Sequence, residues 1–162
     1  MAFVYLLASG GGWLSSKSKG LFKDIQSGRI TGVVSTFTIS EYLSVVRDAL
    51  AEKRGTPPSR QEIAAAEKNL MEFLENIGIE LRDADTLATS ASPFFEDVHQ
   101  IVASSSSVRR TRDREWSGPG GADAVVAALA IRMTATQVAT FDEGFRGLTT
   151  HGLTPLMIGE AY

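Results

Sequence analysis

The architecture of the chain is clearest in two neighbouring segments, Gly121-Ala122-Asp123-Ala124-Val125-Val126-Ala127-Ala128-Leu129-Ala130 and Gln137-Val138-Ala139-Thr140-Phe141-Asp142. The first predicts a helix with Asp123 in its first turn, and the second predicts a strand that ends at Asp142. In a parallel sheet, a helix between two strands begins at the carboxyl edge and runs to the opposite edge. The strand after it then returns the chain to the carboxyl edge. We therefore expect Asp123 and Asp142 at one edge, where open α/β sheets bind ligands.

A third acidic residue, Glu41, reaches this edge by the same logic. It follows the run 30–37, which reads as a buried strand, and it lies in a helix expected from Ile39 to about Lys53. Strands alternate with helices along the chain, and residues 153–158 have the pattern of a last edge strand. This order predicts an α/β fold, a three-layer α/β/α sandwich with a mainly parallel central sheet.

Length and composition fit one globular domain over residues 1–162. The chain is 43% hydrophobic and 22% charged, which is typical of a soluble protein with its own core. A helical hairpin is expected at about 41–76, because Ser59-Arg60-Gln61-Glu62 matches a capping box before a long amphipathic segment.

The residues that are absent or rare exclude several kinds of chemistry. The chain has no cysteine and only two histidines, which excludes disulfides, thiolate chemistry and histidine-rich metal sites. The lack of cysteine suits a reducing cytoplasm, where we expect the protein to act. No apolar run reaches the roughly 20 residues of a membrane span, so no membrane contact is expected. A net charge of -3 means that any nucleic-acid binding must use a local patch.

Each of the three acids has a structural explanation when it is taken alone. Thr38-Ile39-Ser40-Glu41 matches a capping box, Asp123 suits the positive end of a helix dipole, and Asp142 opens a turn. Together, however, three carboxylates at one edge repel one another unless a cation compensates their charge. Mg²⁺ or Mn²⁺ fits such oxygen ligands. Glu41, Asp123 and Asp142 are therefore the predicted metal ligands and catalytic residues, suited to phosphodiester hydrolysis.

A basic segment with an aromatic residue precedes Asp123. Its arginines are candidates for phosphate contacts, and its tryptophan is a candidate for stacking on an unpaired base. The alternative is an ordinary solvated loop. The candidate RNA-binding residues are Arg109, Arg110, Arg112, Arg114 and Trp116.

Three blocks of the sequence resemble the PIN domain family, and especially its toxin-type ribonuclease branch. Segments 33–43, 121–130 and 139–145 look like the blocks that hold the family's second, third and fourth acids, in the right order. The resemblance implies an α/β/α sandwich and Mg²⁺- or Mn²⁺-dependent cleavage of single-stranded RNA. It also implies homodimers and, in the toxin branch, a small antitoxin partner.

The family's first acid, at the end of the first strand, has no counterpart in this sequence. If Phe3–Leu7 corresponds to the run that follows this acid, the acid and a strand would precede Met1. If Phe3–Leu7 is the first strand itself, Ala8 or Ser9 replaces the acid. Foldability favours the second alternative, but the register of Ser27–Ile30 with Glu41 favours the first, and we therefore expect that the first strand and its acid are missing. Either way, three of four acids predict weak metal binding and little turnover.

Two further classes of function compete with a ribonuclease. A catalytically inactive PIN-fold module would bind RNA or a partner protein without metal-dependent cleavage. A different phosphohydrolase with an acidic site would turn over small phosphoesters and leave RNA intact.

Overall fold

The computed structural model describes residues 1–5, 15–82, 91–104, 108–109, 116–117 and 120–161. Its centre is a five-stranded sheet with the order β3-β2-β1-β6-β7, in which every pair of neighbours is parallel. The strands are β1 (Ala2–Tyr5), β2 (Gly32–Val34), β3 (Glu80–Leu81), β6 (Gln137–Thr140) and β7 (Thr154–Met157). As predicted, the last strand lies at an edge, which accommodates Pro155.

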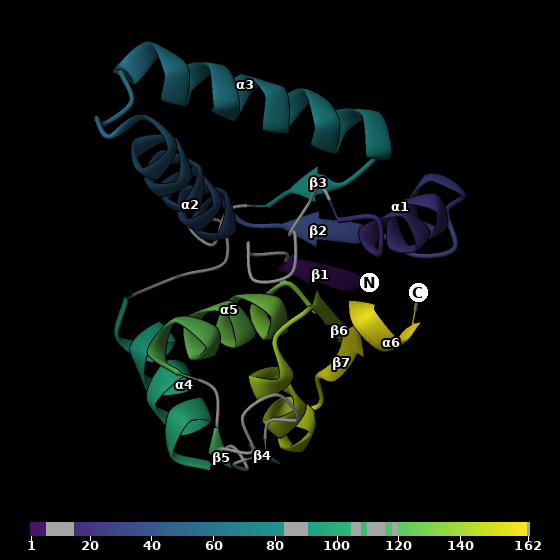
Figure 1. Cartoon of the computed structure of the whole chain (residues 1–162). Coiled ribbons are helices and arrows are strands. Elements are labelled where there is room, and N and C mark those ends of the chain that lie inside the picture. Colours follow the sequence, from purple (N-terminus) through teal and green to yellow (C-terminus); the bar gives the residue numbers. More distant parts are fainter. Residues whose placement is uncertain (6–14, 83–90, 105–107, 110–115, 118–119, 162) are drawn as a thin grey trace.

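Helices cover both faces of the sheet, so the predicted three-layer α/β/α sandwich is confirmed (Figure 1). One core joins the sheet to α4 (Ala91–Ser104), α5 (Gly121–Arg132) and the 3₁₀ helix η3 (Glu143–His151). The other core joins it to α1 (Ser18–Gln26), α2 (Thr36–Arg54), α3 (Arg60–Ile77) and α6 (Ile158–Ala161). The sheet therefore has apolar side chains on both faces, as parallel sheets require.

The central strand is β1, which pairs with β2 on one side and β6 on the other. All four of its residues are buried, which explains why this segment is continuously apolar instead of alternating. Ala2–Tyr5 therefore forms the sheet's central strand, as in the second alternative above. Ala8 and Ser9, the residues that would replace the first acid, lie outside the described residues.

The segment before Glu41 differs from the prediction in one respect. The strand ends at Val34, and α2 already begins at Thr36, whereas a strand was expected to continue to Phe37. Ser35 is the helix cap, because its Oγ accepts a hydrogen bond from the Thr38 N–H at 3.2 Å. The predicted capping box at 38–41 is therefore wrong, and Glu41 lies inside the helix.

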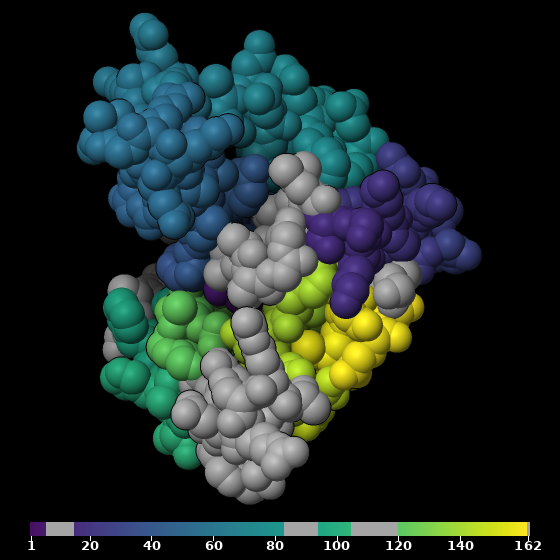
Figure 2. All heavy atoms as spheres, viewed as in Figure 1, coloured from purple at the N-terminus to yellow at the C-terminus, as the bar shows by residue number. Residues whose placement is uncertain are grey.

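The α2 and α3 helices pack against each other as a hairpin that extends away from the sheet (Figures 1 and 2). The predicted capping box at the start of α3 is confirmed: Ser59 Oγ accepts from the Glu62 N–H, and a Glu62 carboxylate oxygen accepts from the Ser59 N–H. Gly55, where α2 ends, has a φ of 72°, a conformation that glycine adopts without strain. No helix in the described part of the chain has the length and apolar character needed to cross a membrane.

Candidate functional site

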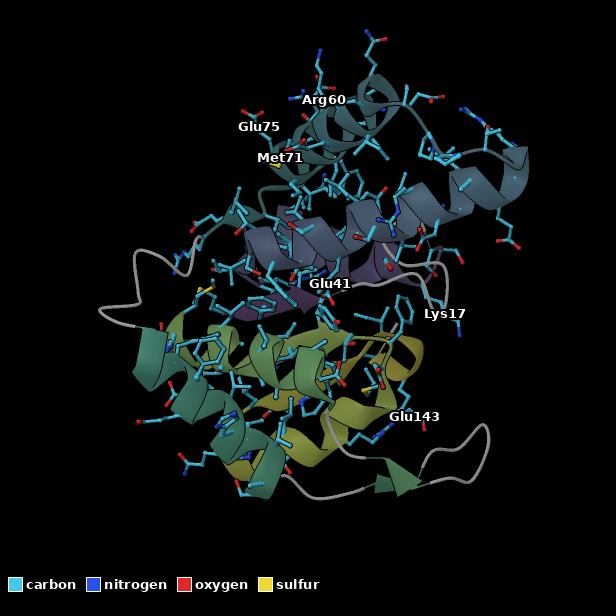
Figure 3. All side chains as sticks on the ribbon, turned by 90° about the vertical axis from the view of Figure 1, so that its left-hand side faces the viewer. Lys17, Glu41, Arg60, Met71, Glu75 and Glu143 are labelled. Atoms are coloured by element: carbon cyan, nitrogen blue, oxygen red, sulfur yellow. The ribbon has the colours of Figure 1, made fainter. Side chains whose placement is uncertain are left out.

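The three predicted acids lie at the carboxyl edge of the sheet, on elements that adjoin its strands. Glu41 is in the second turn of α2, after β2, and Asp123 is in the first turn of α5. Asp142 follows the end of β6 by two residues. Figure 3 shows Glu41 near the middle of the molecule, on the side of α2 that faces α5. All three side chains are half-buried.

A buried tyrosine at the same edge lies within range of the charges of all three acids. Tyr5 is the last residue of β1 and is only 3% exposed. Burial raises the pKa of its hydroxyl strongly, and the charges of Glu41, Asp123 and Asp142 raise this pKa further. A hydroxyl that responds to all three carboxylates lies within their common electrostatic field. The structure thus brings the three acids together around the end of the central strand.

Glu41 is the acid with the least satisfied environment. Burial raises the pKa of its carboxyl, a hydrogen bond with the Tyr5 side chain lowers it, and the charge of Asp123 raises it again. Its Oε2 atom is buried and has no hydrogen-bond partner among the described residues. A buried carboxylate oxygen without a partner is costly, and a bound cation is one of the few groups that relieve that cost.

The other two acids make local hydrogen bonds to backbone. The Gly120 N–H donates to Asp123 Oδ2 at 2.9 Å, and the Gly144 N–H donates to Asp142 Oδ1 at 2.8 Å. These contacts agree with the structural explanations given above, in which Asp123 stabilises the first turn of a helix and Asp142 stabilises a turn. They do not exhaust either carboxylate, because each carboxylate group has about four acceptor sites. Asp123 and Asp142 therefore combine a structural role with a place at the acidic edge.

The acidic edge is not a preformed coordination sphere. Within the described ranges, no three Asp, Glu or His side chains are arranged so that they could hold one metal ion. The edge nevertheless fits a hard cation in two respects, namely the gathered negative charge and the unsatisfied oxygen of Glu41. Binding would require the carboxylates to adjust their present positions.

The basic segment is only partly described. Its two ends pair as short antiparallel strands, β4 (Val108–Arg109) and β5 (Trp116–Ser117), where the sequence had suggested only a loop. The β4 strand packs beside η3, the helix that Asp142 caps. Arg110, Arg112 and Arg114 lie outside the described residues, so their predicted contacts with RNA stay predictions.

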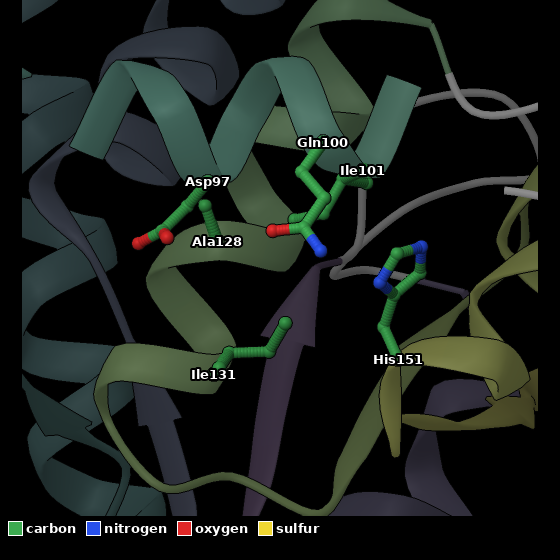
Figure 4. Close-up of a pocket in the computed structure, with 6 residues that line it drawn as sticks. All are labelled: Asp97, Gln100, Ile101, Ala128, Ile131 and His151. Atoms are coloured by element: carbon green, nitrogen blue, oxygen red, sulfur yellow. The ribbon is translucent and has the colours of Figure 1, made fainter. Parts of the chain in front are cut away.

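A cavity of about 170 Å³ lies away from the acids, between α4, α5 and the end of η3 (Figure 4). Two of its polar side chains already have partners: Asp97 forms an ion pair with Arg132 at 2.8 Å, and His151 lies 3.4 Å from Ser104 Oγ. The residues lining it are Asp97, Gln100, Ile101, Ala128, Ile131 and His151. None of the three predicted site residues contributes to this cavity.

Sequence reasoning missed Tyr5 as a member of the site. Tyr5 belongs to the apolar run Phe3–Leu7, and a tyrosine in such a run is typical of core packing. The available signal was its hydroxyl, because a buried tyrosine needs a hydrogen-bond partner. That partner, Glu41, is remote in sequence, and only the fold brings the two side chains together.

Comparison with known proteins adds no family assignment: no protein-family model matches the chain, and no curated protein matches it significantly. The likeness to the PIN domain family therefore rests on the three acidic sequence blocks.

Proposed function

We propose that this protein is a metal-dependent endoribonuclease of the PIN type, which hydrolyses phosphodiester bonds in single-stranded RNA. The observation that carries this proposal is that Glu41, Asp123 and Asp142 lie at the carboxyl edge of the parallel sheet, where Glu41 has a buried carboxylate oxygen without a hydrogen-bond partner among the described residues. Acids that are remote in sequence rarely gather around one point without a compensating charge, because their repulsion destabilises the fold.

Each acid has a defined part in the proposed site. Glu41 offers its unsatisfied Oε2 atom, and Asp123 and Asp142 offer carboxylate oxygens that their backbone hydrogen bonds hold near the sheet edge. Mg²⁺ or Mn²⁺ bound there would supply hydroxide near neutral pH and offset negative charge on the scissile phosphate. Arginines of segment 108–116 would bind the flanking phosphates of the RNA, and Trp116 would stack on a base.

The biological setting is proposed from the family resemblance. A toxin-type ribonuclease of this family acts in the cytoplasm, forms homodimers and is inhibited by a small antitoxin protein. Glu41, Asp123 and Asp142 form no ready-made ligand group within the described residues, which supports weak metal binding and weak turnover.

An RNA cleavage assay tests the proposal. The protein is incubated with fluorescent single-stranded RNA in Mn²⁺ or in EDTA, alongside the Asp123→Asn variant. Asparagine can still accept the hydrogen bond from the Gly120 N–H, so the helix start is preserved while the charge is lost. Asp48→Asn, an exposed change on α2, is the matched control.

We expect slow cleavage that requires Mn²⁺, persists in Asp48→Asn and falls at least about tenfold in Asp123→Asn. Robust cleavage by the Asp123→Asn variant would contradict the assigned site. Turnover of a small phosphoester without cleavage of RNA would instead identify a different phosphohydrolase.

A PIN-fold module that binds RNA or protein without catalysis is the second candidate. The backbone hydrogen bonds of Asp123 and Asp142, and the lack of a preformed ligand group among the described residues, favour this reading. It predicts RNA or protein binding that is the same in Mn²⁺ and in EDTA, with no cleavage in either.

A further inference from the structure

The cavity between α4, α5 and the end of η3 has an apolar side formed by Ile101, Ala128 and Ile131 (Figure 4). Ile131 is 40% exposed, so a large aliphatic side chain meets solvent inside a hollow of the surface. The cavity volume of about 170 Å³ lies below the roughly 300–1,000 Å³ of sites for drug-sized ligands, whereas a cavity of about 150 Å³ accommodates a benzene ring. The cavity therefore suits one flat ring system.

A side-chain amide supplies the polar group that can orient such a ring. Figure 4 shows the Gln100 amide extended from α4 toward the space between Ile131 and His151. The backbone carbonyl of Gln100 accepts from Ser104 Oγ at 2.5 Å, but its side-chain amide makes no hydrogen bond within the described ranges of the chain. The amide therefore keeps both donor and acceptor capacity for a ligand.

The polar side chains on either side of Gln100 are held in place by other contacts. Asp97 Oδ2 accepts from Arg132 Nε at 2.9 Å, and His151 Nε2 lies 3.4 Å from Ser104 Oγ. A ligand would meet walls that are already in position, which lowers the entropic cost of binding.

Among flat ring systems, adenine matches this arrangement best. The carbonyl oxygen of a glutamine side chain accepts from the N6 amino group of adenine while its amino group donates to N7, a bidentate pairing common in nucleic-acid recognition. Pockets for single extruded bases combine such edge contacts with apolar side chains against the face of the ring. Gln100 and Ile131 offer both kinds of contact in one cavity.

We propose that this cavity binds an adenine base, with the Gln100 amide reading its N6 and N7 edge and Ile131 contacting its face. The base belongs either to single-stranded RNA or to a free adenine nucleotide, and the ring chemistry is the same in both. The cavity shares no residue with the acidic edge, and Ile131 lies about 12 Å along α5 from Asp123 by the helical rise. The inference goes beyond the proposed function, because no metal ion takes part in it.

Saturation-transfer-difference NMR with adenosine, in EDTA, tests the site directly. We expect transfer to the adenine ring protons and weaker transfer to guanosine, cytidine and uridine. Gln100→Ala should weaken adenosine binding about fivefold or more, and Ile131→Ala should also weaken it. The matched controls, which should leave binding unchanged, are Gln61→Ala at an exposed glutamine of α3 and Val102→Ala at an exposed valine outside the cavity. Thermal unfolding verifies that each variant is folded.

Two further ligands identify the source of the base. Oligoadenylate that binds more tightly than adenosine, and loses this affinity in Gln100→Ala, would identify RNA. AMP that binds more tightly than oligoadenylate would identify a free nucleotide. No binding of adenosine, equal binding of all the nucleosides, or unchanged affinity in Gln100→Ala would overturn the inference. Those results would leave the proposed ribonuclease intact, because Mn²⁺-dependent RNA cleavage is a separate measurement on other residues.

Discussion

The buried hydroxyl of Tyr5, at the end of the central strand, and the carboxyl of Glu41, inside α2, each shift the pKa of the other. The charge of Asp123 raises the pKa of both members of this pair. These interactions involve the central strand, a helix on one face of the sheet and, through the charge of Asp123, the start of a helix on the other face. The acidic edge is held together by the fold and not by neighbouring positions in the sequence.

Replacing Glu41 by glutamine should stabilise the metal-free protein at neutral pH. Burial raises the pKa of Glu41 above its ordinary value of 4.5, so the folded state binds the proton more tightly than the unfolded state. This contribution to stability is present below that value and is lost as the pH rises through the shifted pKa. At pH 7, Glu41→Gln should therefore raise the Tm of the metal-free protein.

The pH dependence distinguishes this effect from a general change in packing. The gain from Glu41→Gln should shrink as the pH is lowered well below 4.5, because the wild-type carboxyl then becomes protonated in both the folded and the unfolded state. Glu52→Gln, an exposed change on the same helix, should shift Tm little at any pH. A loss of stability in Glu41→Gln at pH 7 would show that the ionised carboxylate stabilises the fold.

Two replacements of Asp142 should separate its structural role from its proposed site role. Asp142→Ala removes the oxygen that accepts from the Gly144 N–H and should cost about 1 kcal/mol in the free energy of unfolding. Asp142→Asn keeps an acceptor and should retain most of that stability. Both variants lose the negative charge, so both should lose Mn²⁺ binding in a titration. Full Mn²⁺ binding by the asparagine variant would show that Asp142 has only a structural role in the turn.

The basic segment should contribute affinity for RNA without sequence preference. Replacing Arg110, Arg112 and Arg114 by glutamine removes up to three phosphate contacts. The slope of log affinity against log salt should then fall by about 0.7 for each lost contact with a single strand. Fluorescence anisotropy with single-stranded RNA at several salt concentrations measures this slope. The double change of Arg47 and Arg60 to glutamine is the control. If it lowers the salt slope equally, the segment has no special role in binding RNA and is an ordinary solvated loop.

The sequence predicts the layers of this fold because local patterns carry them. The helix and strand around Asp123 and Asp142 follow from a continuous apolar composition bounded by glycine and polar residues, and the structure confirms both elements. The start of α2 was misjudged because an apolar run reads equally well as a buried strand or a buried helix turn. Ser35, the actual cap, stands inside that run.

The candidate site is less predictable than the fold, because its contacts join remote parts of the chain. Chain direction placed the three acids at one edge, which needs only the order of strands and helices. The interaction between Tyr5 and Glu41 joins the central strand to α2, and no local sequence pattern encodes it. The backbone hydrogen bonds of Asp123 and Asp142 are local, and their structural readings were accordingly visible in the sequence.

The central claim, that Glu41, Asp123 and Asp142 form one cation site, is tested most directly by Mn²⁺ titration followed by electron paramagnetic resonance. We predict a weak site with one Mn²⁺ per chain. Glu41→Gln, Asp123→Asn and Asp142→Asn should each weaken it at least about tenfold, and Asp48→Asn should leave it unchanged. Absence of Mn²⁺ binding, or binding that survives all three substitutions, would contradict the account.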